Sequence, residues 1–111
     1  MRSDRVQLAR FETLIRDKLK LPVTIDEREE FFYLYRVATG KEPQDSVHQT
    51  IRREFAEGKT EIIKKIYKAM AERAIQDYSE KLVKYSLTPM HEDFEKQIKI
   101  LREFIIDLND I

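Results

Sequence analysis

The sequence predicts an all-α fold, a single-domain bundle of about five helices over residues 1–111, built on a C-terminal antiparallel helical hairpin. Apolar residues recur at intervals of three and four in five segments, which is the period of one helix face. No stretch shows the period-two alternation of a half-buried strand. The two longest segments, residues 60–85 and 89–109, are separated by only a short break. We therefore expect them to pack as antiparallel neighbours.

The first predicted helix covers residues 3–19 and begins with Ser3, a residue type favoured at the N-cap. Its apolar face consists of Leu8, Phe11, Ile15 and Leu19. The helix ends before Pro22, which lacks an N–H and disfavours a helical conformation in the residue before it.

The second predicted helix covers residues 25–39. Thr24 and Glu27 have the spacing of a capping box, in which each side chain accepts a hydrogen bond from a free backbone N–H at the start of the helix. Gly40 follows the last helical residue, and glycine readily adopts the left-handed conformation that closes many helices. These signals define both ends of the segment.

An aromatic run, FFYLYRVA at residues 31–38, lies inside the second helix. Successive helical residues turn by about 100°, so its apolar side chains surround the helix. Such a helix is either central in the core or in contact with a partner, and a platform for stacking bases is a third interpretation. A partner at this helix would contact Phe32, Tyr33 and Tyr35.

The third predicted helix, residues 44–57, has a single narrow apolar stripe and stops at Gly58. The stripe consists of Val47, Ile51 and Phe55. The remaining faces are polar, so this helix is predicted to dock by one side only.

The last two helices carry the longest apolar stripes. Between residues 60 and 85 the stripe consists of Ile63, Ile66, Tyr67, Met70, Ala74, Tyr78, Leu82 and Tyr85. Between residues 89 and 109 it consists of Phe94, Ile98, Leu101, Ile105 and Leu108, the heptad-like spacing of two helices packed nearly antiparallel. Thr88 is the expected N-cap of the last helix, with Pro89 at its first position.

A second apolar face on the last helix is formed by Ile100, Phe104 and Ile111. Either another subunit binds this face, or one of the first two helices covers it. Together with the aromatic run, it provides the candidate protein interface.

The composition excludes several classes of protein. Without cysteine, the chain has no disulfide, no thiolate metal site and no cysteine nucleophile, and it fits a reducing compartment. No apolar run approaches the roughly 18 residues of a membrane span, and the charged N-terminus resembles no signal peptide. Charge is balanced, with 21 basic and 21 acidic residues, so no net charge attracts nucleic acid or a membrane. We expect a cytoplasmic protein.

No catalytic or cofactor motif is present. A phosphate-binding loop needs closely spaced glycines, and the chain has only Gly40 and Gly58, which lie far apart in the sequence. Its two histidines, His48 and His91, lie at helical spacing from single carboxylates, but neither lies among apolar positions that would face a bundle core. We therefore expect no catalytic residue, no metal and no cofactor, and we expect that the protein is not an enzyme.

Nucleic-acid binding is the alternative function. Residues 24–59 resemble a helix-turn-helix in outline, although the turn is longer than usual. Residues 41–68 hold seven basic and five acidic side chains, a modest local surplus of positive charge. The candidate base readers are Gln44, Ser46, His48 and Gln49, and the candidate phosphate contacts are Arg52, Arg53, Lys59, Lys64, Lys65 and Lys68.

From these patterns we expect a non-enzymatic interaction or assembly subunit that binds itself or a larger protein complex through apolar helix faces. A homo-oligomer is the expected form. Nucleic acid is the less favoured partner, because acidic side chains are interspersed among the basic ones and repel phosphate.

Overall fold

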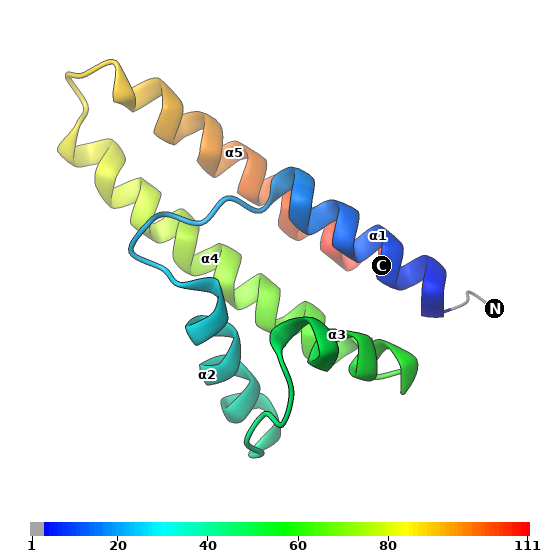
Figure 1. Cartoon of the computed structure of the whole chain (residues 1–111). Helices are drawn as coiled ribbons and strands as arrows, with labels where there is room; N and C mark the ends of the chain where they lie inside the picture. The colour runs from blue at the N-terminus through cyan, green and yellow to red at the C-terminus, as the bar shows by residue number, and fades with distance from the viewer. Residues whose placement is uncertain (1–3) are drawn as a thin grey trace.

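The computed structural model describes residues 4–111, and within that range it contains five α-helices and no strand (Figure 1). The helices are α1 (Asp4–Lys18), α2 (Glu27–Thr39), α3 (Val47–Ala56), α4 (Thr60–Lys84) and α5 (Met90–Asn109). The predicted all-α fold class and the predicted order of helices are confirmed. The proposed N-cap Ser3 lies outside the described residues.

The helices form two layers, and the antiparallel hairpin of α4 and α5 is the longer one (Figure 1). Helix α1 lies along the C-terminal half of α5, while α2 and α3 pack on the N-terminal half of α4. The Cα atoms span 48 × 30 × 16 Å, so the molecule is an elongated slab. The half of the hairpin next to its turn therefore extends beyond the other three helices.

An aromatic cluster joins the two layers. The fully buried ring of Tyr67 on α4 lies 5.2 Å from that of Phe11 on α1 and 5.9 Å from that of Phe31 on α2, measured between centroids. Phe55 on α3 lies 5.2 Å from Phe11. Contacts between aromatic rings at such distances stabilise a core beyond the area they bury. Helices α1 and α2 thus meet α4 at Tyr67, and α3 joins the cluster through Phe11.

The Tyr67 hydroxyl donates a hydrogen bond to Glu27 Oε2 at 3.1 Å, in the first turn of α2. Burial raises the pKa of Tyr67, and the Glu27 carboxylate raises it further, so the hydroxyl remains a donor. A second link runs from Arg73 to Glu30, which raises the pKa of Arg73 through their hydrogen bond. Both contacts fix α2 against α4.

The start of α2 differs from the predicted capping box. Asp26 is the N-cap, and its Oδ1 accepts a hydrogen bond from the Glu29 N–H at 3.0 Å. Thr24 instead donates to Asp77 Oδ1 on α4 at 3.3 Å. The capping interpretation of Thr24 was wrong, because Asp26 has an equally good capping side chain and lies directly before the helix.

The predicted helix stops behave as expected at both glycines. Gly40 has φ 73° and Gly58 has φ 74°, the left-handed conformation that other residues adopt at a cost. At the start of α5, however, Pro89 is the N-cap and Thr88 donates its hydroxyl to the Tyr85 carbonyl oxygen at 2.9 Å. Thr88 therefore stabilises the turn after α4 and does not cap α5.

The hairpin core follows the predicted stripes in the middle of both helices, whereas Leu82, Tyr85 and Phe94 near the turn are only half-buried. Ile98, Leu101 and Leu108 of α5 are buried against α4, as expected. Phe104 is fully buried, whereas its neighbour Ile105 is only half-buried. The fully buried residue is therefore Phe104 and not Ile105, because α5 is covered by α1 as well as by α4.

Leu101→Ala is expected to lower the free energy of unfolding by about 2–5 kcal/mol, because it empties a fully buried site between the two long helices. Lys96→Ala, on an exposed position of the same helix, is the matched control and should cost less than about 0.5 kcal/mol. Urea denaturation followed by circular dichroism measures both. Equal losses would mean that the buried face of α5 is wrongly placed.

Candidate interaction surfaces

The aromatic run of α2 divides between the core and the surface. Tyr35, which the sequence placed at a partner interface, is only 4% exposed and donates its hydroxyl to Glu54 Oε1 at 3.0 Å. It belongs to the chain's own core. Phe32 is half-buried, and the guanidinium of Arg28 lies 5.3 Å from its ring centroid. Of the three proposed interface residues, only Tyr33 is open to solvent, at 56% exposure.

The second apolar face predicted on α5 is largely covered within the chain. Phe104 is fully buried, and Ile100 and Ile111 are half-buried. Helix α1 packs on this part of α5, which is the second of the two possibilities that the sequence left open. Phe104 therefore stabilises the monomer and is not available to a partner.

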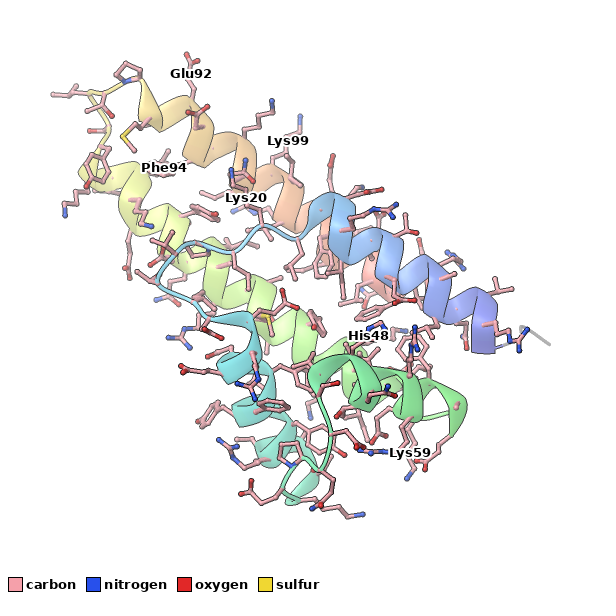
Figure 2. The ribbon with its side chains drawn as sticks, viewed as in Figure 1. Lys20, His48, Lys59, Glu92, Phe94 and Lys99 are labelled. Carbon is pink, nitrogen blue, oxygen red and sulfur yellow. The ribbon has the colours of Figure 1, made fainter. Side chains whose placement is uncertain are left out.

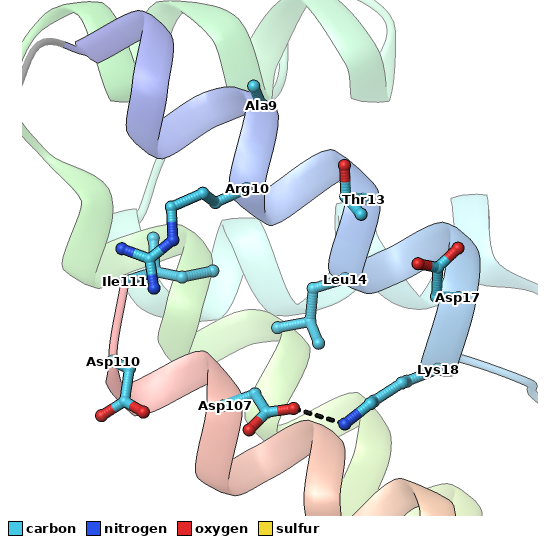
Figure 3. Close-up of a pocket in the computed structure, with 9 residues that line it drawn as sticks. All are labelled: Ala9, Arg10, Thr13, Leu14, Asp17, Lys18, Asp107, Asp110 and Ile111. Carbon is cyan, nitrogen blue, oxygen red and sulfur yellow. Dashed lines mark hydrogen bonds and ion pairs between the residues drawn. The ribbon is translucent and has the colours of Figure 1, made fainter.

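A surface pocket of about 460 Å³ lies between α1 and the end of α5, with Leu14 and Ile111 in its wall (Figure 3). Lys18 Nζ donates to Asp107 Oδ2 at 2.5 Å across it. This hydrogen bond raises the pKa of Lys18 and ties α1 to α5. Because Lys18 and Asp107 are bonded to each other, this pair holds the two helices together.

The candidate base readers on α3 are partly engaged in local contacts. The Ser46 hydroxyl caps α3 by accepting from the Gln49 N–H at 3.2 Å. His48 Nδ1 lies 3.7 Å from Glu12 Oε2 on α1. Gln44 is exposed in the long connection between α2 and α3. The apolar stripe of α3 faces the core as predicted, with Ile51 and Phe55 buried.

Half of the candidate phosphate contacts lie opposite carboxylates. The pairs are Arg53 with Asp45, Lys59 with Glu57 and Lys64 with Glu61. For Arg52, Lys65 and Lys68 no ion pair is found within residues 4–111. A phosphate would therefore have to compete with existing partners at half of the six positions.

Helix α5 carries a second stripe that the sequence analysis did not single out. Its members have the same three-and-four spacing as the buried stripe and are all exposed: Glu92, Glu95, Lys99, Arg102 and Ile106. Two acidic residues are thus followed by two basic residues and one apolar residue. In Figure 2, Glu92 and Lys99 both extend outward from α5.

A groove of about 650 Å³ runs between α4 and α5 beside this stripe, and we refer to it as the hairpin groove. It is lined by Ser79, Leu82, Glu92, Glu95, Lys96, Ile98, Lys99 and Arg102. Glu95 Oε2 lies 3.9 Å from His91 Nδ1, whereas Glu92, Lys99 and Arg102 have no ion pair in the described part of the chain. These three charges are free to meet a partner.

The turn of the hairpin is apolar and exposed. Leu87 is 99% exposed, Val83 is 78% exposed and Met90 is 49% exposed. The exposure of Leu87 could have been predicted from the sequence, since Leu87 lies in the break between two helical patterns. The exposure of Val83 could not, because Val83 lies inside a helix, beside the apolar stripe of α4.

No family model matches the chain, and neither a curated protein nor a solved structure matches it. No group of three or more His, Asp or Glu side chains among the described residues is arranged to hold a metal ion. None of the five described helices combines the length and the apolarity needed to cross a bilayer.

Weak nucleic-acid binding at most is expected from the ion pairs around α3. At about 150 mM salt, duplex DNA and single-stranded RNA should not be retained in a gel-shift titration at micromolar protein. The triple change Arg52→Ala, Lys65→Ala and Lys68→Ala removes the unpaired cations and provides the comparison. Submicromolar binding by the unaltered chain, lost in the triple variant, would establish nucleic acid as a partner.

Proposed function

We propose that the protein is a non-enzymatic assembly subunit and that its partner is a second copy of the same chain, docked along the hairpin groove. The exposed charged stripe of α5 is the observation that carries this proposal. The lack of cysteine agrees with a reducing, cytoplasmic setting.

The order of charges on this stripe is self-complementary under antiparallel pairing. A twofold axis near Gln97 would place Glu92 of each copy opposite Arg102 of the other, and Glu95 opposite Lys99. In such a symmetric interface the same patch serves both partners. Opposite charges across an interface fix its register and disfavour the parallel alternative, which sets like charges face to face.

The apolar residues fit the same register. The twofold axis that pairs the charges also brings Ile106, which is 64% exposed, next to the hairpin turn of the other copy. That turn carries the exposed side chains of Leu87 and Met90. Burying apolar surface contributes roughly 25 cal/mol per Å², so these contacts add affinity to the specificity of the charges.

The slab also provides enough area. A stable interface buries about 800 Å² on each partner. The broad side of the molecule measures 48 by 30 Å between Cα atoms, and α1, α2 and α3 share one side of the hairpin. The hairpin groove therefore has room for a second hairpin, which would complete a four-helix arrangement.

Self-association at micromolar concentration is expected, and reversing one half of the stripe should weaken it by at least about tenfold, because like charges opposite one another cost several kcal/mol. Two double variants do this separately, Glu92→Lys with Glu95→Lys and Lys99→Glu with Arg102→Glu. Sedimentation equilibrium measures each alone and then the equimolar mixture. The mixture should associate again as a heterodimer.

The control is Glu29→Lys with Glu57→Lys, which makes the same charge change on the layer of α2 and α3 and should leave association unchanged. A monomer at all concentrations would contradict the proposal. So would two charge-reversal variants that associate as well as the original chain, or a mixture that stays monomeric.

A further inference from the structure

A second pocket, of about 460 Å³, lies where the ends of α2 and α3 meet. Its lining includes Tyr35, Lys41, Arg53, Glu54, Glu57 and Lys59. The volume falls within the range of roughly 300–1,000 Å³ that small-molecule sites occupy. Lys59, which follows the end of α3, is labelled in Figure 2.

Glu54 is the unusual group in this pocket. It is one of two polar residues that are buried among those that the structure describes, with 4% exposure. Its Oε1 accepts the hydrogen bond from Tyr35, whereas its Oε2 is covered from solvent and has no hydrogen-bond partner. A buried acceptor without a partner is costly, so a donor that reaches this oxygen would recover a large part of the cost.

The surrounding backbone also favours a positive group. Helix α2 ends at Thr39 and α3 ends at Ala56, and the residues that follow each end line the pocket. The C-terminus of a helix carries a partial negative charge, which stabilises cations nearby. Two such ends and one carboxylate therefore converge on the same space.

Two of the three cationic side chains that line the pocket are paired with carboxylates. Arg53 pairs with Asp45, and its hydrogen bond with Tyr35 is the main cause of its raised pKa. Lys59 Nζ lies 3.6 Å from Glu57 Oε2. Lys41 is exposed at the rim and makes no ion pair with the described residues. The free oxygen of Glu54 is thus left to a donor from outside.

We propose that this pocket binds a small molecule with a guanidinium or primary ammonium group at one end and a carboxylate at the other, as in a basic amino acid. The cationic end parts the side chains at the rim and donates to Glu54 Oε2, and the carboxylate meets Lys41. Charge-assisted hydrogen bonds of this kind are stronger than neutral ones and provide the selectivity.

The probe is L-arginine, titrated into ¹⁵N-labelled protein and followed by NMR. L-Citrulline is the matched control, because it has nearly the same shape but a neutral urea in place of the guanidinium. Arginine should shift the backbone signals around Tyr35, Glu54 and Lys59 in a saturable way, and citrulline should not. Glu54→Gln should weaken arginine binding by about tenfold or more, and Glu61→Gln, at an exposed carboxylate outside the pocket, should not.

Agmatine, which is arginine without its carboxylate, tests the other end of the site. Lys41→Ala should weaken the binding of arginine and leave that of agmatine unchanged. Circular dichroism establishes that each variant is folded, and if Glu54→Gln is not, the comparison of arginine with citrulline on the original chain decides. Equal responses to arginine and citrulline, no response to either, or unchanged arginine binding in a folded Glu54→Gln variant would overturn the proposal.

Discussion

The buried ring of Tyr67 is the contact on which the arrangement of the helices depends. It places Phe11 of α1 and Phe31 of α2 on the same side of α4, and Phe55 of α3 follows through Phe11. Its hydroxyl cannot be buried without a partner, and the bond to Glu27 both satisfies it and fixes the first turn of α2. This side chain thus joins α1 and α2 to α4, and α3 is joined to them through Phe11.

This one-sided layer explains why the surface of the hairpin is uneven. On α5 the stripe that includes Leu101 and Phe104 is buried, while the stripe from Glu92 to Ile106 is exposed although both have the same spacing. A bundle that surrounded its longest helices would have covered both stripes. The exposed stripe combines charges with an apolar end, and it is the surface that the second copy would cover in the proposed dimer.

Periodicity and stop signals were sufficient to predict the helices, because each element carries a regular apolar stripe and the first four are followed by a glycine or a proline. They could not predict which side of a helix each neighbour covers. Phe104 and Ile105 are adjacent in sequence, and only the position of α1 makes Phe104 the fully buried one. The hydrogen bond between Tyr35 and Glu54 could not be predicted from the sequence either, because it depends on how the long connection after Gly40 places α3 against α2.

The most direct test of antiparallel pairing is the distance between spin labels in two associated copies. Because the chain has no cysteine, one introduced cysteine is the only site that a thiol-reactive label modifies. Lys96→Cys lies beside the proposed twofold axis, and Glu103→Cys lies on the same exposed edge of α5. At 1.5 Å of rise per residue, the labels at position 103 should be separated by up to about 15 Å more along the helix axis than those at position 96. Equal distances at both positions would indicate parallel helices, and the absence of any dipolar coupling would indicate that the copies do not associate; either result contradicts pairing along the hairpin groove.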